Sequence, residues 1–195
     1  MGGASRTLAC PAIGGKPSCG RWDFESNTAE GWAFDTALAG VYHAGVGQPA
    51  ASTTTSLSPT HSLAIQFDGQ GSPGTQLVYV KVPLCANGQG VDLRSKSFGA
   101  HLRFVTTPGT PNFDAGQGHT VRLWTGPLDG PEGLDFSVDP ATGGGSSPGS
   151  WYFVGGGPLQ DYFGPGIDAV THIGFRLLFN SAWKGTIYID YVEVY

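Results

Sequence analysis

Residues 171–195 read THIGFRLLF, NSAWKG and TIYIDYVEVY in succession, and this stretch decides the fold class. In the first segment, apolar side chains recur at every second position from Ile173 to Phe179. A period of two places these side chains on one face of a β-strand and the intervening ones on the other. The last segment is rich in β-branched and aromatic residues, which are typical of strands. We therefore predict two strands separated by the loop NSAWKG.

The same alternation recurs upstream, in short segments bounded by clusters of Gly, Pro, Asn and Ser. Apolar residues share one face in three further sets, which are Leu63, Ile65 and Phe67; Phe98, Leu102 and Phe104; and Val121 and Leu123. The other candidate strands are RWDFES (21–26), GWAFDT (31–36), SLAIQFD (62–68), QLVYVKV (76–82), SFGAHLRFV (97–105), HTVRLW (119–124) and SWYFV (150–154). Because no helical pattern intervenes, we predict an all-β sandwich of two packed antiparallel sheets, a jelly roll of about ten strands.

The composition excludes a helix-rich fold. Glycine and proline occupy 32 and 14 of the 195 positions, and no stretch free of both exceeds ten residues. A mean helix needs about 11 residues, and an interior glycine costs about 1 kcal/mol relative to alanine. The length fits one β-sandwich domain. We expect residues 1–20 to form an N-terminal linker or strap and residues 21–195 a single domain, with long loops at 106–118 and 139–149.

Charge and cysteine content limit the classes of partner. The net charge of −5 argues against nucleic-acid binding, which draws its affinity from neutralised phosphates. No apolar run approaches the roughly 18 residues that span a bilayer, so no membrane partner is expected. Of the three cysteines, Cys10 and Cys19 enclose the loop PAIGGKPS, and we favour a disulfide between them. The alternative is that all three, Cys85 included, are small buried or loop residues.

The strand faces opposite the apolar sets carry an unusual group of side chains. They are Gln66, Asp68, Tyr79, Lys81, His101, Arg103, Arg122, Trp124, His172 and Arg176. Four of the ten Lys and Arg residues are among them. If these strands are neighbours in one sheet, the side chains form a groove floor of cations, amide and aromatic groups. The alternative is an ordinary solvated sheet face, on which long polar side chains are the rule.

Such a floor suits carbohydrate. Sugar rings pack their C–H faces on aromatic planes, and their hydroxyls need fixed donors and acceptors. Clustered arginines suit a carboxylated sugar in particular. We expect Trp124 to be the main platform, and Trp183, in the loop NSAWKG, to border the site. Trp22, Trp32 and Trp151 are interpreted as structural.

Five segments, taken in order, resemble a known family. They are WDFESNTAEGWAF, HSLAIQFDG, VDLRSKSFGAHLRF, SWYFV with DAVTHIGFRLLF, and WKGTIYIDYVEVY. Together they resemble the jelly-roll carbohydrate-binding modules attached to bacterial glycoside hydrolases, over roughly residues 21–195. The resemblance implies a secreted, monomeric, non-catalytic module that binds a polysaccharide or oligosaccharide and targets an appended enzyme to its substrate.

The resemblance also implies a structural Ca²⁺ ion. In these modules a carboxylate of the opening segment meets an Asp of the closing strand, and the matching residues here are Glu25 and Asp190. Calcium binds six to eight oxygens, so backbone carbonyls near Asp23 and around residues 61–62 would complete the shell. The alternative is that both carboxylates face solvent at strand edges.

Two other functions remain open. A jelly-roll glycosidase needs two carboxyl groups across a cleft, and the four Glu of the chain suggest no convergent pair. A polysaccharide lyase needs a base and a cation, which Tyr79, His101, Arg103 and Arg122 would supply. An extracellular adhesive module would instead use the polar face to contact another protein.

Overall fold

The computed structural model describes residues 20–35, 47–68, 75–85, 88–110, 120–126, 132–136, 150–180 and 183–195. The predicted strap and the loop at 139–149 lie outside these residues, apart from Gly20. The described elements are β1 (Arg21–Trp22), β2 (Ala33–Phe34), β3 (Ala50–Ser52), β4 (Ser62–Phe67), β5 (Thr75–Pro83), β6 (Phe98–Thr106), β7 (Thr120–Gly126), β8 (Glu132–Phe136), β9 (Trp151–Gly156), α1 (Gln160–Phe163), β10 (His172–Asn180) and β11 (Gly185–Val194).

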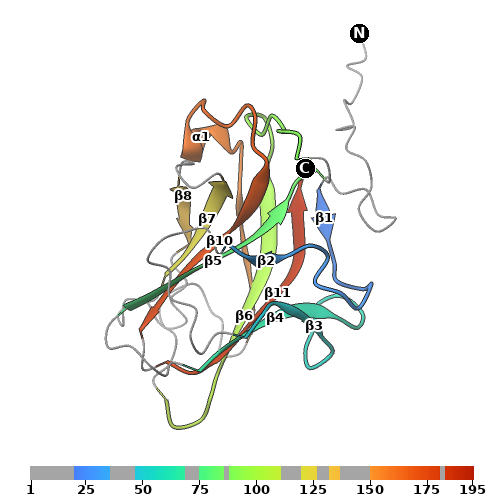
Figure 1. Cartoon of the computed structure of the whole chain (residues 1–195), viewed down its shortest axis with the longest axis vertical. Coiled ribbons are helices and arrows are strands. Elements are labelled where there is room, and N and C mark those ends of the chain that lie inside the picture. The colour runs from blue at the N-terminus through green and yellow to red at the C-terminus, as the bar shows by residue number, and fades with distance from the viewer. Residues whose placement is uncertain are drawn as a thin grey trace.

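The strands form two antiparallel sheets, as predicted (Figure 1). The first has the order β3-β4-β11-β6-β9, with β1 also paired to β11, and the second has the order β2-β5-β10-β7-β8. From β4 to β7, and again from β9 to β11, successive strands belong to alternate sheets. Chain segments that cross between two packed sheets in this way make a jelly roll. The described residues contain eleven strands, close to the ten predicted.

The core lies between the two sheets and is built from the predicted apolar faces. Ile173, Phe175 and Leu177 of β10 are fully buried, and so are Leu63 and Ile65 of β4. The predicted set on β6 is buried as well. Burial of an apolar side chain contributes roughly 1.5–3 kcal/mol, so the alternation on each strand selects which of its faces turns inward.

Two tryptophans predicted to be structural are part of this core. Trp22 is 4% exposed and Trp32 is 3% exposed. Their rings meet edge to face with centroids 6.0 Å apart, and Trp32 stacks on Phe175 at 5.8 Å. These contacts anchor the short N-terminal strands to β10.

The N-terminal elements are shorter than predicted. The segments 21–26 and 31–36 each keep only two strand residues. Phe24, Asn27 and Glu30 have positive φ angles, which end a strand because extended backbone requires negative φ. β3 and β8 are strands that the sequence did not predict. Both are short, and β8 includes a glycine and two acidic residues, which are uncommon in strands.

β11 carries a bulge that matters for its outer face. Its register against β6 shifts between Asp190 and Glu193, and Tyr191 within the bulge has a φ of 48°. A bulge inserts an unpaired residue and redirects nearby side chains. α1 has only four residues, and the described part of the chain contains no helix long and apolar enough to cross a membrane.

Candidate functional site

The ten predicted outward residues do not share one surface. β4 and β6 belong to the six-stranded sheet; they carry Gln66, His101 and Arg103, and Asp68 directly follows β4. β5, β7 and β10, which carry the other six, belong to the five-stranded sheet. The expected single groove floor is therefore wrong, because the two groups lie on opposite outer faces of the sandwich. Period-two patterning assigns a face to each strand but does not assign strands to sheets.

On the five-stranded sheet, the register aligns the predicted residues in two neighbouring rows. The Arg176 row runs Tyr79, Arg176, Arg122 and Asp135 across β5, β10, β7 and β8. The Gly174 row runs Lys81, Gly174, Trp124 and Glu132 across the same strands. Three of the four predicted cations and the predicted platform tryptophan therefore occupy adjacent rows of one sheet.

Two of these residues are less available than expected. Tyr79 is only 7% exposed, so its ring offers little surface to a ligand. The ammonium of Lys81 lies 2.6 Å from Asp35 Oδ2, and the Asp35 residue is 4% exposed. A carboxylate so deeply buried needs its partner, because a lone buried charge is costly. Lys81 thus joins β5 to the residue that follows β2.

His172 lies at the next outward position of β10, beyond Gly174. Burial lowers the pKa of its imidazole, and the nearby charge of Lys81 lowers it further, while Asp35 opposes the shift. Nδ1 of His172 lies 3.0 Å from the hydroxyl of Thr171. The ring is therefore neutral at pH 7 and serves as a hydrogen-bonding group.

β8 adds two carboxylate residues that sequence reasoning missed. Asp135 pairs in register with Arg122, and Glu132 pairs with Trp124. Glu132 follows Pro131 and precedes Gly133, so its segment carries no strand pattern. With Asp35, the sheet brings three acidic residues beside Lys81, Arg122 and Arg176. The formal charges balance, and the reason for expecting a preference for carboxylated sugars is weakened.

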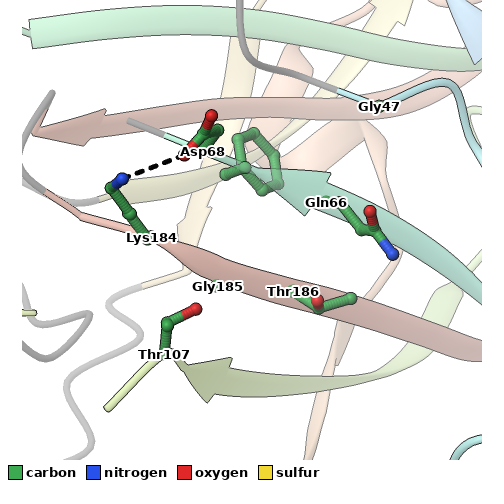
Figure 2. Close-up of a pocket in the computed structure, with 8 residues that line it drawn as sticks. Gly47, Gln66, Asp68, Thr107, Lys184, Gly185 and Thr186 are labelled. Atoms are coloured by element: carbon green, nitrogen blue, oxygen red, sulfur yellow. Dashed lines mark ion pairs between the residues drawn. The ribbon is translucent and has the colours of Figure 1, made fainter. Parts of the chain in front are cut away.

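Gln66 lies in a separate pocket of about 540 Å³, where β4 ends and β11 begins (Figure 2). Its lining consists of Gly47, Gln66, Phe67, Asp68, Thr107, Lys184, Gly185 and Thr186. Lys184 Nζ lies 3.1 Å from Asp68 Oδ1 at one end, and Gln66 and Thr186 lie at the other. The pocket offers hydroxyl, amide and charged groups, and its one aromatic side chain, Phe67, is 3% exposed.

Trp183 does not border a site with an exposed ring. It is completely buried, its indole N–H donates to Thr106 Oγ1 at 3.1 Å, and its ring packs on Phe67 with centroids 5.4 Å apart. The prediction was wrong because the loop position suggested exposure, whereas the ring turns back into the core between the sheets. Trp183 packs against Phe67, which in turn lines the pocket.

Arg103 and His101 lie on β6, on the outer face of the six-stranded sheet. Arg103 Nη1 donates to Thr55 Oγ1 at 2.6 Å, so the guanidinium holds the segment that follows β3. The His101 ring lies between Phe153 and Tyr191, with centroids 5.3 and 6.3 Å away. Burial lowers the pKa of His101, against the raising influence of Asp190 and Glu193. Phe153, 60% exposed, was missed because it sits in a segment read as structural.

The predicted metal residues Glu25 and Asp190 meet at Ser58. The Ser58 N–H donates to Asp190 Oδ2 at 2.8 Å, and its hydroxyl lies 2.6 Å from Glu25 Oε1. Asp190 is fully buried and also accepts from the N–H of Leu57 at 2.8 Å. The pKa of Glu25 is lowered to about 2, chiefly by hydrogen bonds from the side chains of Ser58 and Thr60. Asp190 therefore does not face solvent, whereas the Glu25 side chain is 28% exposed and hydrogen-bonded.

The oxygens around Ser58 are the ones predicted for an ion shell. Besides Glu25 Oε1, the Ser58 hydroxyl lies 2.8 Å from the carbonyl oxygen of His61 and 3.3 Å from that of Asp23. One hydroxyl has a single hydrogen to donate, so three acceptors cannot all be satisfied by it. Within the described residues there is no group of three or more His, Cys, Asp and Glu side chains placed to hold a metal. Any ion here would depend on carbonyl and hydroxyl oxygens in addition to the Glu25 carboxylate.

One cysteine of the described residues forms a disulfide that was not predicted. Cys85 is disulfide-bonded. The predicted pair Cys10–Cys19 lies outside the described residues, but the chain has only three cysteines. A disulfide at Cys85 and one between Cys10 and Cys19 cannot both form. Sequence spacing favoured the short loop because it says nothing of which distant segments approach each other.

The fold is that of β-sandwich carbohydrate-binding modules. A CBM28 module described as specific for non-crystalline cellulose is 12% identical, with a TM-score of 0.57 over 94% of this chain and 96% of that one. The CBM27-1 module of Caldicellulosiruptor saccharolyticus, in complex with mannohexaose, is 16% identical, with a TM-score of 0.56 over 89% and 94%. The CBM22-1 xylan-binding domain of Paenibacillus barcinonensis is 12% identical, with a TM-score of 0.50 over 94% and 96%. No family model and no curated protein matches the sequence.

Proposed function

We propose that this protein is a non-catalytic carbohydrate-binding module that binds a neutral polysaccharide on the outer face of its five-stranded sheet. The observation that carries the proposal is the pair of adjacent rows centred on Arg176 and Gly174. Their register brings a tryptophan, three cationic residues and three acidic residues together from five separate segments of the chain.

The chemistry of the two rows fits a sugar chain. Tryptophan is a large apolar surface for the C–H face of a pyranose, and Trp124 is adjacent in register to Gly174, which has no side chain. Charged and amide groups beside such a platform bind hydroxyls as donors or acceptors. Lys81 is already fixed by Asp35 at 2.6 Å, which lowers the entropy cost of ordering it against a ligand.

The balance of charge favours a neutral polymer over an acidic one. Lys81, Arg122 and Arg176 are matched by Asp35, Glu132 and Asp135 on the same sheet. A carboxylated glycan would meet as many like charges as opposite ones. We therefore expect binding to change little with ionic strength, since screening acts on unbalanced exposed charge.

The biological setting follows from the fold similarity and is part of the proposal. The structurally similar modules bind xylan, mannohexaose or non-crystalline cellulose according to their descriptions. We propose a corresponding role here, as a secreted, monomeric module that targets an appended enzyme to its polysaccharide. The similarity of fold supports this role, and the identity of the polymer is left to experiment.

We also propose that Ca²⁺ binds where Glu25, Asp190 and the segment 57–61 meet. The support is the set of oxygens around Ser58, which has too few hydrogens for its acceptors. Hard oxygen donors from carboxylate and carbonyl groups are the ligands that calcium prefers. Glu25 and the carbonyls of Asp23 and His61 would hold the ion, with Asp190 orienting Ser58 through its backbone N–H. The ion would supply positive charge that links β1 to β11.

The function is tested by affinity electrophoresis in gels containing hydroxyethylcellulose, xylan, glucomannan or alginate. The protein should be retarded by at least one of the neutral polymers, with no new chain ends produced. Trp124→Ala should weaken binding roughly fivefold, as expected when one aromatic contact of about 1 kcal/mol is lost.

The matched control is Tyr162→Ala, which removes an aromatic ring that is 43% exposed on α1 and belongs to neither of the two register rows. It should bind as the wild type does. Retardation by alginate alone, abolished by salt, would refute the neutral ligand. Unchanged binding by Trp124→Ala would remove the five-stranded sheet as the site, and release of unsaturated sugar products would show a lyase.

A further inference from the structure

The outer face of the six-stranded sheet presents an exposed aromatic ring in mid-strand. Phe153 of β9 is 60% exposed. Its ring lies over the register pair Gly99 and Gly155, where a Cβ on Gly155 would come 2.7 Å from Phe153 Cζ and one on Gly99 would come 3.1 Å from Cε2. Glycine at both positions is what lets the ring lie against the sheet. The opposite side of the ring faces solvent.

Neighbouring rings hold Phe153 in place. His101, its register partner on β6, contacts it at 5.3 Å between centroids. The bulge in β11 brings Tyr191 to the other side of His101, with centroids 6.3 Å apart and planes at 72°. The guanidinium carbon of Arg21 lies 4.8 Å above the Tyr191 ring. The Phe153 ring is supported from beneath by Gly99 and Gly155 and from the side by His101, so it is largely ordered before any ligand binds.

Polar and aromatic groups border this ring along the next rows of the sheet. Glu193 pairs in register with Gly99 on one side and with Arg21 on the other. Its Cγ lies 3.7 Å from where a Gly99 Cβ would be. Beyond it, Tyr195 exchanges two backbone hydrogen bonds with Ser97 and is 61% exposed. The Phe153 ring thus shares one sheet face with one carboxylate, one guanidinium and two phenols, from β1, β6, β9, β11 and the residue after β11.

We propose that this surface, the Phe153 shelf (Arg21, His101, Phe153, Tyr191, Glu193 and Tyr195), is a second carbohydrate-binding site that stacks a neutral pyranose ring on Phe153. It lies on the opposite sheet from the site in the proposed function and shares with it only the class of ligand. Glu193 hydrogen-bonds a hydroxyl at the edge of the stacked ring, and Arg21 orders the far end of the shelf by packing over Tyr191.

The observations favour a neutral sugar over other occupants. The shelf carries one cation and one carboxylate in register, so it has no charge with which to select an acidic chain. Besides Phe153 and Tyr195, the large apolar residues exposed in the described chain are Leu57, Val105 and Tyr162, of which Val105 lies on β6 four positions from His101 and the other two lie outside the strands of the shelf. One ring with polar neighbours matches the size and chemistry of a sugar, whereas a stable protein interface buries about 800 Å² on each partner.

Two faces that bind the same polymer give the module an additional property. Two polysaccharide chains, one bound on each sheet, would be cross-linked through the module, because each module then has two separate binding sites. The wild type should therefore make solutions of its polymer turbid, and loss of either face should abolish this effect while binding persists.

The experiment compares the wild type with Phe153→Ala, Phe153→Trp, Trp124→Ala and the double variant Trp124→Ala/Phe153→Ala. Each is titrated with hydroxyethylcellulose, xylan and glucomannan by calorimetry and turbidity, after circular dichroism has established folding. Phe153→Ala should weaken binding about fivefold and remove turbidity, Phe153→Trp should retain both, and the double variant should bind about 25-fold more weakly, since losses at distant sites add. Tyr162→Ala is again the control.

The outcomes separate this proposal from the proposed function. If Phe153→Ala binds every polymer as the wild type does while Trp124→Ala does not, the Phe153 shelf is rejected and the five-stranded sheet stands. If only Phe153→Ala loses binding, the shelf is the site and the five-stranded sheet is rejected. If Phe153→Ala binds polymer unchanged but no longer self-associates, as measured by sedimentation, the sugar site is rejected. The Phe153 shelf is then a contact with a second copy of the chain.

Discussion

At the scale of single residues, several polar side chains are held by specific partners. His172 is an example, because burial and the charge of Lys81 keep its imidazole neutral. Ser58 is another, since its N–H and hydroxyl join two carboxylates that are 165 positions apart in the chain, at residues 25 and 190. Such residues couple the state of one proton or ion to the stability of the whole fold.

The lowered pKa of His172 predicts how stability depends on pH. The unfolded imidazole takes up a proton as the pH falls through about 6.5, while the folded one resists until a lower pH. The unfolded state therefore binds more protons in this window, and stability rises with pH across it. Between the folded pKa of His172 and about pH 6.5, the unfolding midpoint of His172→Gln should rise less steeply with pH than that of the wild type.

The control for this prediction is His101→Gln, because burial lowers the pKa of His101 in the same direction. Each single variant should remove part of the pH dependence, and the double variant more than either. Thermal unfolding followed from pH 5 to 8 measures it. Equal slopes for the wild type and His172→Gln would mean that the imidazole titrates alike in both states.

At the scale of elements, β10 is the central strand of the five-stranded sheet, because it pairs along its length with both β5 and β7. Its inward residues build the core, and its outward residues supply the centres of both proposed ligand rows. Gly174 lies between Lys81 and Trp124 in register. The strand passes so near β5 at this point that a side chain has no room.

This close approach makes Gly174→Ala a sharp test of strand packing. A Cβ there would collide with the carbonyl oxygen of Val80, which belongs to the backbone of β5 and cannot turn aside. We expect a loss of about 1–3 kcal/mol in the free energy of unfolding, the usual cost of overpacking. Urea denaturation measures it.

Gly166→Ala is the matched control, because the position is open and its φ lies outside the left-handed region. That variant should unfold within about 0.5 kcal/mol of the wild type. If both variants lose stability equally, the effect comes from removing glycine and the tight contact between β5 and β10 plays no part.

The elements also mark the limit of prediction from pattern. The long strands β4, β5, β6, β10 and β11 were predicted within two residues at each end, because their alternation is sustained. β3 and β8 were missed, since AAS and EGLDF carry no such signal. β8 mattered for function, because it adds Glu132 and Asp135 to the sheet and changes the expected charge of the ligand.

At the scale of the whole molecule, the segment 57–61 ties the beginning of the domain to its last strand. Glu25 follows β1, Asp190 lies in β11, and both are bonded to this segment. Gly20 also accepts a hydrogen bond from the N–H of Val194, so the two ends of the domain lie together (Figure 1). An ion bound here would stabilise the closed sandwich as a unit.

The proposed Ca²⁺ site therefore predicts a response of global stability to the ion. Ca²⁺ should raise the unfolding midpoint and EDTA should lower it. The free energy of unfolding should increase by about 2.7 kcal/mol at an ion concentration one hundred times the Kd. Glu25→Gln should lose this response, whereas Asp161→Asn, on exposed α1, should retain it. Identical melting curves with Ca²⁺ and with EDTA would contradict the site.

The sequence by itself determined which face of each long strand is apolar, and hence that two antiparallel sheets pack around a core. It did so because side-chain alternation is a local property of extended backbone. Only the tertiary structure decided that Gln66, His101 and Arg103 belong to one sheet and Arg176 and Trp124 to the other, and that Trp183 turns inward. Strand order, β-bulges and the approach of distant segments depend on contacts between residues far apart in the chain, which no local pattern contains.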